Sequence, residues 1–333
     1  MGSRLDVIGI GNAIVDVVAR APDALLAEVG LAKGSMTLID AARADTLRAR
    51  AEAAVEVSGG SAANTMVGAA RLGSAAGYVG KVRGDAAGAA FRHDIEAAGV
   101  RFPTPAAKAG APTARCIIFV TPDAQRTMGT HLGACVELGP GDIDPAFIAS
   151  APLLYLEGYL WDPPAAKEAF RKALEIAHGA GGRVCLSLSD SFCVERHRAE
   201  LRALVADEID VLFANEDEAM ALYEVGSFEA ALAAARDDCA ICAITRSEKG
   251  SVVAGQGEAH TIAAAPVARV VDTTGAGDLY AAGFLAGLAR GFDLARCGRL
   301  AALAAGEIIG HAGARPEADI APFVDASALL PAS

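Results

Sequence analysis

Short apolar runs alternate with longer amphipathic stretches along most of the chain. The runs are apolar at successive positions, which is typical of strands covered on both faces. The stretch 163–178 begins with two prolines and is followed by Gly179, the expected start and stop signals of a helix. This alternation predicts an α/β fold, with a doubly wound, mostly parallel sheet and helices on both faces. The predicted strands are Val7–Ile10, Cys116–Val120, Leu153–Leu156, Val184–Leu188, Val211–Phe213 and Ile241–Ile244.

Two regions break the alternation. Residues 35–38 and 54–57 are strand-like and flank a short polar segment, and residues 115–120 with 126–130 have the pattern of a hairpin. Strand pairs without crossover helices indicate a small second sheet beside the main one. We find no repeat, low-complexity tail or linker, and therefore expect one domain over residues 1–333.

Composition narrows the class of protein. Hydrophobic residues make up 53% and charged residues 21%, which excludes disorder for most of the chain. The net charge of −12 argues against sequence-independent nucleic-acid binding, although a local basic patch could bind a small phosphate. The start of the chain lacks a charged-then-apolar leader, and its apolar stretches are interrupted before about 20 residues. We therefore expect a cytoplasmic protein without a membrane segment.

Seven scattered cysteines do not predict a disulfide framework. Cys239 and Cys242 form a C-x-x-C inside an apolar, strand-like run, and no second Cys or His pair follows at zinc spacing. A buried structural role is therefore favoured over redox or metal chemistry.

The most informative segment is a glycine-rich helix start. Gly275, Ala276 and Gly277 precede an apolar helix, and their free N–H groups favour an anion. Asp278 lies in the first turn, where it could merely stabilise the helix dipole or take a proton from a hydroxyl that attacks a phosphoryl group. The chain has no G-x-x-x-x-G-K-[ST] motif. Its G-x-G after the first strand lacks the third glycine, with Ile14 in that place, so a dehydrogenase is weakly supported.

The sequence resembles the ribokinase-like (PfkB) carbohydrate and nucleoside kinases. Residues 272–278, D-T-T-G-A-G-D, resemble the family's C-terminal signature, and residues 59–64, G-G-S-A-A-N, its N-terminal signature. Three shorter matches are N-x-x-E at 215–218, the nucleotide loop at 245–250 and G-x-G-N with an aspartate at 9–16. The matches run in family order over nearly the whole chain, and within the family they are most similar to adenosine kinases.

The resemblance implies transfer of the γ-phosphoryl group of ATP to a hydroxyl, with Mg²⁺ as cofactor. Asp278 falls on the catalytic base position, and the N–H groups of Gly275, Ala276 and Gly277 fall on the anion hole. The positions that hold sugar hydroxyls are matched by Asn12, Asp16, Gly59, Gly60 and Asn64. The nucleotide-binding positions are matched by Asn215, Thr245, Gly250, Gly275 and Gly277. Glu218 matches a position that orders water around Mg²⁺, and a monovalent-cation site, with K⁺ as the candidate, is matched by Asp272, Thr274 and Gly313.

Each motif also has a plainer interpretation. Asn12 and Asp16 could mark a turn after the first strand, and Gly59-Gly60 a hairpin bend. Asn215 and Glu218 are one helical turn apart, which also fits an ordinary N-cap with exposed acids. Their joint occurrence in family order favours the functional interpretation.

Several positions depart from the family pattern. Arg246-Ser247 replaces the glycine-containing form of the nucleotide loop, and Arg83 replaces a usual glycine. Ala302 stands where ribokinases often have an asparagine near the adenine. These changes bear on the nucleotide donor and its phosphate contacts, and they leave the catalytic signature intact.

We therefore expect a ribokinase-like fold whose small sheet acts as a lid, formed by segments near 12–20, 33–58 and 112–134. The expected reaction is phosphoryl transfer to the 5′ hydroxyl of a nucleoside, converting adenosine to AMP. A ribokinase, fructokinase or other sugar kinase is the alternative, and a non-catalytic nucleoside-binding protein is an alternative of a different class. Either a monomer or a homodimer is compatible with the sequence. The expected apolar slot for a base is lined by Met36, Leu38, Cys116, Phe119 and Leu132.

Overall fold

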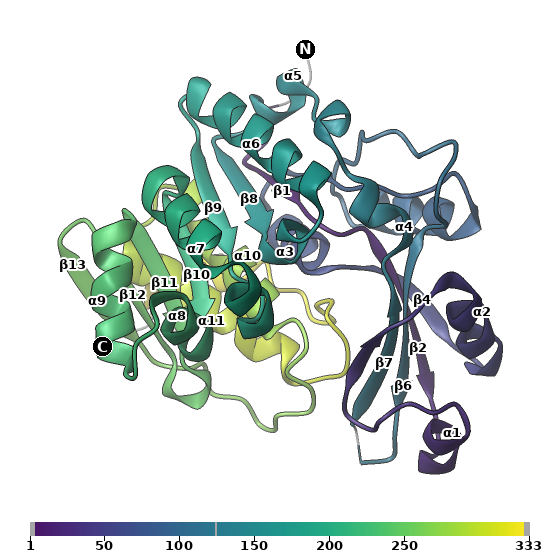
Figure 1. The fold of residues 1–333 in the computed structure, drawn as a ribbon. Helices are drawn as coiled ribbons and strands as arrows, with labels where there is room; N and C mark the ends of the chain where they lie inside the picture. Colours follow the sequence, from purple (N-terminus) through teal and green to yellow (C-terminus); the bar gives the residue numbers. More distant parts are fainter. Residues whose placement is uncertain (1–3, 124, 330–333) are drawn as a thin grey trace.

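The computed structural model describes residues 4–123 and 125–329, in which the main feature is an eight-stranded sheet flanked by helices (Figure 1). Its strands, in spatial order, are β13 (Glu258–Ile262), β12 (Ser251–Gly255), β11 (Ile241–Thr245), β10 (Val211–Asn215), β9 (Arg183–Ser187), β8 (Leu153–Glu157), β1 (Val7–Ile10) and β5 (Ala76–Val79). Neighbours from β5 to β11 are parallel, and β12 and β13 join antiparallel at one edge. The predicted mostly parallel sheet is confirmed, and five of the six predicted strands lie in it.

Successive residues of the central strands enter different hydrophobic cores. In β8, Tyr155 belongs to the core beneath α3 (Ser61–Arg71), α10 (Ala276–Ala289) and α11 (Leu294–Ile308), whereas Leu154 belongs to the core beneath α6 (Pro164–Gly179). A strand alternates its side chains between two faces, so burial of both faces requires apolar residues at successive positions. The doubly covered sheet is therefore confirmed.

Helix boundaries follow the capping signals in the sequence. Pro163 is the N-cap of α6, and Asp85 caps α4 (Ala86–Ala97) by accepting from the Gly88 amide at 2.8 Å. The other α-helices are α1 (Asp23–Glu28), α2 (Ala41–Arg50), α5 (Pro145–Ile148), α7 (Ser191–Glu208), α8 (Glu216–Tyr223), α9 (Phe228–Asp238) and α12 (Phe323–Leu329). Short 3-10 turns are η1 (Gly133–Glu137), η2 (Pro140–Asp142), η3 (Gly158–Trp161) and η4 (Ser247–Lys249). None of the helices in the described ranges combines the length and the apolar character needed to cross a membrane.

A second, five-stranded sheet lies beside the large one (Figure 1). Its strands, in spatial order, are β3 (Met36–Leu38), β7 (Arg126–His131), β6 (Ala114–Val120), β2 (Ile14–Arg20) and β4 (Val55–Gly59). The predicted hairpin is confirmed, because β6 and β7 pair antiparallel. The prediction that no helix joins β3 to β4 was wrong, since α2 lies between them, capped by Asp40 and burying Ala44 and Leu47. Its three arginines and one aspartate obscured that narrow apolar face.

The cysteines are buried free thiols, in agreement with the prediction of no disulfide framework. Cys239 ends α9 and Cys242 lies within β11, so the C-x-x-C belongs to a helix-to-strand connection.

Candidate active site

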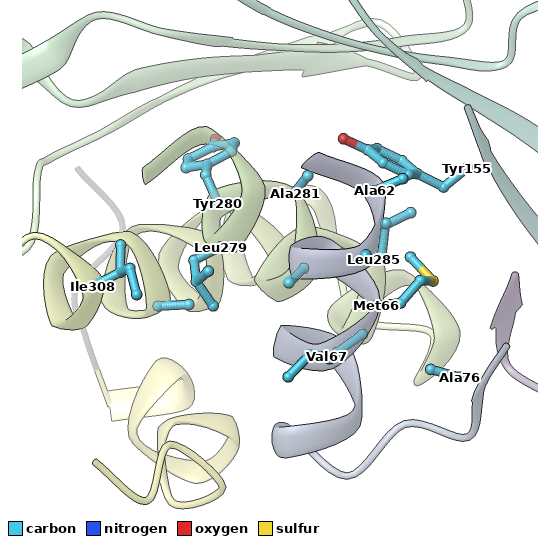
Figure 2. Close-up of a cluster of buried hydrophobic side chains, with 14 of the residues drawn as sticks. Ala62, Met66, Val67, Ala76, Tyr155, Leu279, Tyr280, Ala281, Leu285 and Ile308 are labelled. Atoms are coloured by element: carbon cyan, nitrogen blue, oxygen red, sulfur yellow. The ribbon is translucent and has the colours of Figure 1, made fainter. Parts of the chain in front are cut away.

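Close packing of α3 against α10 brings the two signature motifs together (Figure 2). A Cβ on Gly68 would lie within 2.8 Å of side-chain atoms of Leu279 and Ala282, so only glycine permits this approach. The first turns of the two helices then meet, and the Asp278 carboxylate accepts from Ser61 Oγ at 2.6 Å and from Asn64 Nδ2 at 3.0 Å. Residues more than 200 positions apart in the chain thus hold the candidate base in one orientation.

The surroundings of Asp278 suit a proton acceptor. Burial raises the pKa of its carboxyl, while the hydrogen bonds from Ser61 and Asn64 and the charge of Arg315 partly offset that rise. A carboxylate with a raised pKa is a stronger base than an exposed one. The arrangement can therefore accept a proton from a nearby hydroxyl.

The part of the site expected to hold the sugar, here called the acceptor side, is built around Asn12. This residue follows β1 and is 4% exposed. Its side-chain Nδ2 donates to Glu157 Oε1 at 2.8 Å, and its backbone N–H donates to the same oxygen at 3.3 Å. Its Oδ1 is buried and has no hydrogen-bond partner among the described residues, and the same holds for Oδ1 of Asn64. Two unpartnered acceptors therefore remain for a ligand that donates hydrogen bonds.

Both glycines of the N-terminal signature are required by these neighbours. A Cβ on Gly59 would collide with the Asp16 carboxylate, and one on Gly60 would collide with the Asn12 carbonyl. Gly60 also has φ +96°, in the region that favours glycine. The structure thus brings Asn12, Asp16, Gly59, Gly60 and Asn64 together at the start of α3.

Asp16 lies on β2 of the second sheet and faces the site. Burial raises its pKa to about 6, opposed by the charges of Arg126 and Arg315 and reinforced by that of Asp278. Arg315 anchors this region by donating to the Ser58 and Ala63 carbonyls. Arg126 donates its hydrogen bond to Asp272, and Arg315 donates to the Ser58 carbonyl. Within the described part of the chain, these two cations therefore leave the oxygens of Asp16 free to accept hydrogen bonds from a ligand.

The amides expected to form an anion hole lie at the start of α10, where Gly275 is the N-cap. Gly275 has φ +79° and packs against Ala314, 3.0 Å from the position of an added Cβ. The Ala276 amide donates to the Thr273 carbonyl at 3.2 Å. Of the amides expected to form the anion hole, that of Ala276 is therefore engaged within the turn, and the geometry favours Gly275 and Gly277.

Two cavities meet at this helix start. One, of 380 Å³, is lined by Asp278, Asn215, Glu218 and Tyr159. The other, of 540 Å³, has a largely apolar lining that includes Val267, Val270, Ala302, Gly250 and Ile309. The two adjoin, because Thr245, Gly277 and Tyr280 line both. The predicted nucleotide-side residues Asn215, Thr245, Gly250, Gly275 and Gly277 are all lining residues of one or both.

Asn215 and Glu218 form a capping box at the start of α8. Glu218 accepts from the backbone N–H and Nδ2 of Asn215 at 2.9 and 2.8 Å. Burial raises its pKa to about 7, the Asn215 amide opposes the rise, and Asp190 and Asp217 add to it. The described residues contain no cluster of three or more His, Cys, Asp or Glu side chains that could hold a metal. Glu218 is the carboxylate beside the 380 Å³ cavity that could order water around an Mg²⁺ ion carried by phosphate oxygens.

Asp272, Thr274 and Gly313 come together, but their cation is an arginine. Asp272 accepts from the backbone and side chain of Thr274, from the Gly313 amide at 3.1 Å, and from Arg126 Nη1 at 2.8 Å. Burial alone would raise the pKa of Asp272, but these hydrogen bonds and the Arg126 charge lower it below its usual value. Because the carboxylate is already neutralised and its oxygens are engaged, the residues do not fit a monovalent-cation site, and we assign no step to K⁺.

The structure explains the positions at which the sequence departs from the family pattern, namely Arg246-Ser247 in the nucleotide loop and Arg83. Ser247 has φ +51°, the conformation that glycine adopts without cost. Arg246 pairs with Glu216 at 3.1 Å, and its guanidinium lies 3.8 Å from the Phe228 ring centroid. The loop is therefore fixed to the first turns of α8 and α9 by contacts that a glycine could not make. Arg83 donates to the Gly110 carbonyl at 3.1 Å, outside both cavities.

The expected base slot is only partly assembled. In the pairing of β2 with β6, Asp16 lies opposite Cys116. Phe119 lies three residues after Cys116, an odd number of positions along the strand. Phe119 therefore faces the opposite side of the second sheet and is fully buried there, so its assignment to the slot was wrong. Leu38 lies on the same face of the sheet as Asp16, because it pairs with Thr130, which pairs with Cys116 opposite Asp16. Met36, two residues before Leu38, shares this face. Their side chains are 53% (Met36) and 61% (Leu38) exposed.

Sequence reasoning missed several residues of the site. Ser61 stood inside a quoted motif, but nothing in the sequence indicated that it would contact Asp278. Glu157 directly followed the predicted strand Leu153–Leu156, and Arg126 began a predicted hairpin strand, so only their position at strand ends could have drawn attention to them. Tyr159, which is 40% exposed and lines the cavity with Asp278, had no motif at all.

Known proteins share the fold of this chain over nearly its whole length. The chain is 50% identical to adenosine kinase from Sinorhizobium meliloti, covering 98% of this chain and 100% of that one with a TM-score of 0.89. It is 47% identical to a probable sugar kinase from Rhizobium etli, covering 99% and 100% with a TM-score of 0.90. A curated relative, 5-dehydro-2-deoxygluconokinase from Shouchella clausii, is 26% identical over 92% of this chain and 90% of its own length. The model of the pfkB family carbohydrate kinases matches residues 24–321, and the chain belongs to that family.

Proposed function

We propose that this protein transfers the γ-phosphoryl group of ATP to the 5′ hydroxyl of a nucleoside, with adenosine as the first candidate. One observation carries the proposal: the unpartnered Oδ1 atoms of Asn12 and Asn64 lie in a site that also contains the Asp16 and Asp278 carboxylates. All four groups accept hydrogen bonds. The neighbouring hydroxyls of a ribose are donors, so a ribosyl group satisfies this set.

In the proposed mechanism, the residues position the hydroxyl and accept its proton. Asp16 and the two asparagine oxygens hold the sugar hydroxyls, leaving the 5′ oxygen toward Asp278. Asp278 accepts the proton as the oxygen attacks the γ-phosphorus. The N–H groups at the start of α10 offset the charge of the transferring group. Mg²⁺, when bound with ATP, would neutralise phosphate charge near Glu218.

The two cavities support a division of the site between donor and acceptor. The 540 Å³ cavity is mostly apolar, which suits the adenine of ATP, and it adjoins the smaller cavity that holds Asp278. The triphosphate would then run along Gly275 and Gly277 toward Asp278. The second sheet acts as a lid in this proposal, because its residue Asp16 would contact the acceptor and exclude water.

The choice of a nucleoside over a free sugar rests on apolar neighbours of Asp16. Cys116 lies opposite Asp16 on β6, and Ile118 lies two residues further along on the same face. Such side chains pack against a purine ring and offer a free sugar little. The polar groups alone would also recognise a sugar, and the curated relatives include sugar kinases, so a sugar kinase is the second candidate. A cytoplasmic role in reusing purine nucleosides accompanies the first candidate.

The test is kcat/KM with ATP and Mg²⁺ for adenosine, inosine, guanosine, ribose and fructose under one condition. We expect a nucleoside to exceed ribose and fructose. If a free sugar exceeds every nucleoside, the sugar kinase takes the place of this proposal. If no acceptor is phosphorylated although ATP and adenosine both bind, the protein is a non-catalytic binding protein.

A further inference from the structure

Glu157 is a buried carboxylate to which the proposed reaction gives no direct role. It ends β8 and is 1% exposed. Its hydrogen bonds come from the amides of Asn12 and Ala62, and the charge of Asp278 opposes its ionisation. An isolated buried carboxylate is costly, because burial disfavours the charged form. The two oxygens of Glu157 hold two neighbouring segments, at Asn12 and at Ala62.

One oxygen sets the direction of the Asn12 side chain. An asparagine amide has a donor at one end and an acceptor at the other. Because Asn12 Nδ2 donates to Glu157 Oε1 at 2.8 Å, its Oδ1 points the other way, and that oxygen is the buried atom without a partner. The Glu157 carboxylate has only acceptors when it is ionised, and in that form, which predominates above a pH of about 7, it allows only this orientation of the amide.

The other oxygen holds the start of α3. Glu157 Oε2 accepts from the Ala62 amide at 2.8 Å. Ala62 lies next to Ser61, whose hydroxyl donates to Asp278 at 2.6 Å. A Cβ on Gly11 would collide with this oxygen, so the glycine before Asn12 makes room for the carboxylate. One side chain thus links the acceptor-side residue Asn12 to the helix turn that orients the candidate base.

We propose that Glu157 is a positioning residue that fixes the polarity of the Asn12 amide, so that the acceptor site presents an oxygen and selects ligands with a hydroxyl donor at that point. This inference rests on the proposed function for the identity of the acceptor. Glu157 itself does not touch the acceptor, because both its oxygens are occupied by Asn12 and Ala62.

The first test is Glu157→Gln, which keeps the shape of the side chain. The glutamine would place its own N–H₂ group next to three N–H donors, which are Nδ2 and the backbone amide of Asn12 and the backbone amide of Ala62. This arrangement favours reversal of the Asn12 amide, so that Nδ2 instead of Oδ1 faces the bound nucleoside. We expect KM for adenosine to rise about tenfold or more, the effect of losing one or two hydrogen bonds, while KM for ATP stays within about twofold. Asp210→Asn is the matched control. Asp210 accepts from the Val184 amide at 2.7 Å beyond the opposite ends of the strands, and its substitution should leave both KM values unchanged.

The second test is rescue by the reciprocal change. Asn12→Asp alone would place two carboxylates in contact and should also weaken adenosine binding. In the double variant Asn12→Asp/Glu157→Gln, the glutamine can donate to the new carboxylate, whose other oxygen again faces the acceptor. We expect kcat/KM for adenosine in the double variant to exceed that of either single variant by about tenfold.

The outcomes separate this inference from the proposed function. If the wild type phosphorylates an acceptor and Glu157→Gln leaves its KM within about twofold, the positioning role is wrong. If Glu157→Gln lowers activity and the double variant shows no rescue, Glu157 is merely structural and the inference is also overturned. If the wild type phosphorylates no acceptor, the proposed function fails. The inference is then judged by NMR of the Asn12 side-chain N–H₂ group, assigned with Asn12→Asp. Its signals should move on Glu157→Gln and stay in place on Asp210→Asn, and signals that do not move on Glu157→Gln would overturn the inference.

Discussion

The Arg126 guanidinium of the second sheet donates to the Asp272 carboxylate at 2.8 Å, and both side chains are only 12% exposed. Asp272 also accepts from Gly313 and Thr274, so the ion pair ties β7 to the loop that leads into the candidate anion site. An ion pair that is largely removed from water is screened little by salt. It therefore fixes the second sheet against the loop before α10, with the two charges neutralising each other.

This ion pair predicts that turnover does not require K⁺. Arg126 supplies the charge that a monovalent cation would otherwise supply at Asp272. Rates of phosphorylation at constant ionic strength in KCl, NaCl and choline chloride should agree within about twofold. Stimulation by K⁺ of fivefold or more would contradict this explanation of the Asp272 site.

Gly59→Ala should disrupt the acceptor side of the site selectively. The added Cβ collides with the Asp16 carboxylate, which must move away. KM for adenosine should rise about tenfold or more, with KM for ATP nearly unchanged. The control is Gly179→Ala at the end of α6, where an added Cβ meets no atom within 4 Å. Equal effects of the two substitutions on adenosine binding would refute the contact with Asp16 as the cause.

The buried Glu157 predicts a dependence of stability on pH. Burial raises its pKa from 4.5 to about 7, so the folded state binds a proton more tightly than the unfolded state does. Its contribution to stability is fully present below pH 4.5 and is lost as pH rises through about 7, a change of about 3 kcal/mol. Denaturant unfolding between pH 4.5 and 8 should therefore show a free energy that falls more with pH in the wild type than in Glu157→Gln. Parallel curves for the two proteins would show that Glu157 is not the titrating group.

The alternation of apolar runs with capped helices predicted most of the fold. Strands such as β8 and β11 each have four successive apolar residues, so their burial on both faces was visible without tertiary information. Helix α2 was missed because its buried face consists of Ala44 and Leu47 among charged residues. A narrow apolar face gives a weak periodic signal in the sequence. The helix forms because this face packs against β6 and β7 of the second sheet, a contact that the sequence alone does not reveal.

The candidate site was predictable where motifs carried it and hidden where tertiary contacts did. The glycines at 59 and 60 appeared as a motif, but only the structure showed that they make room for Asp16 and Asn12. The partner of Asp272 could not be inferred, because Arg126 is separated from it by 146 residues and lies in the other sheet. Phe119 was misplaced because strand phase depends on register, and a shift of one residue exchanges the two faces.

The central claim is that Asp278 accepts the proton of the attacking hydroxyl, and the most direct measurement is single-turnover phosphorylation of adenosine by Asp278→Asn. The amide keeps the shape of the side chain, so ATP and adenosine should still bind with affinities within a few fold of the wild type. The rate of transfer should fall by about 10²–10⁴, because the proton acceptor is lost. Ser61→Ala, which removes only one hydrogen bond to Asp278, should lose about tenfold. A transfer rate in Asp278→Asn above half that of the wild type would contradict the account.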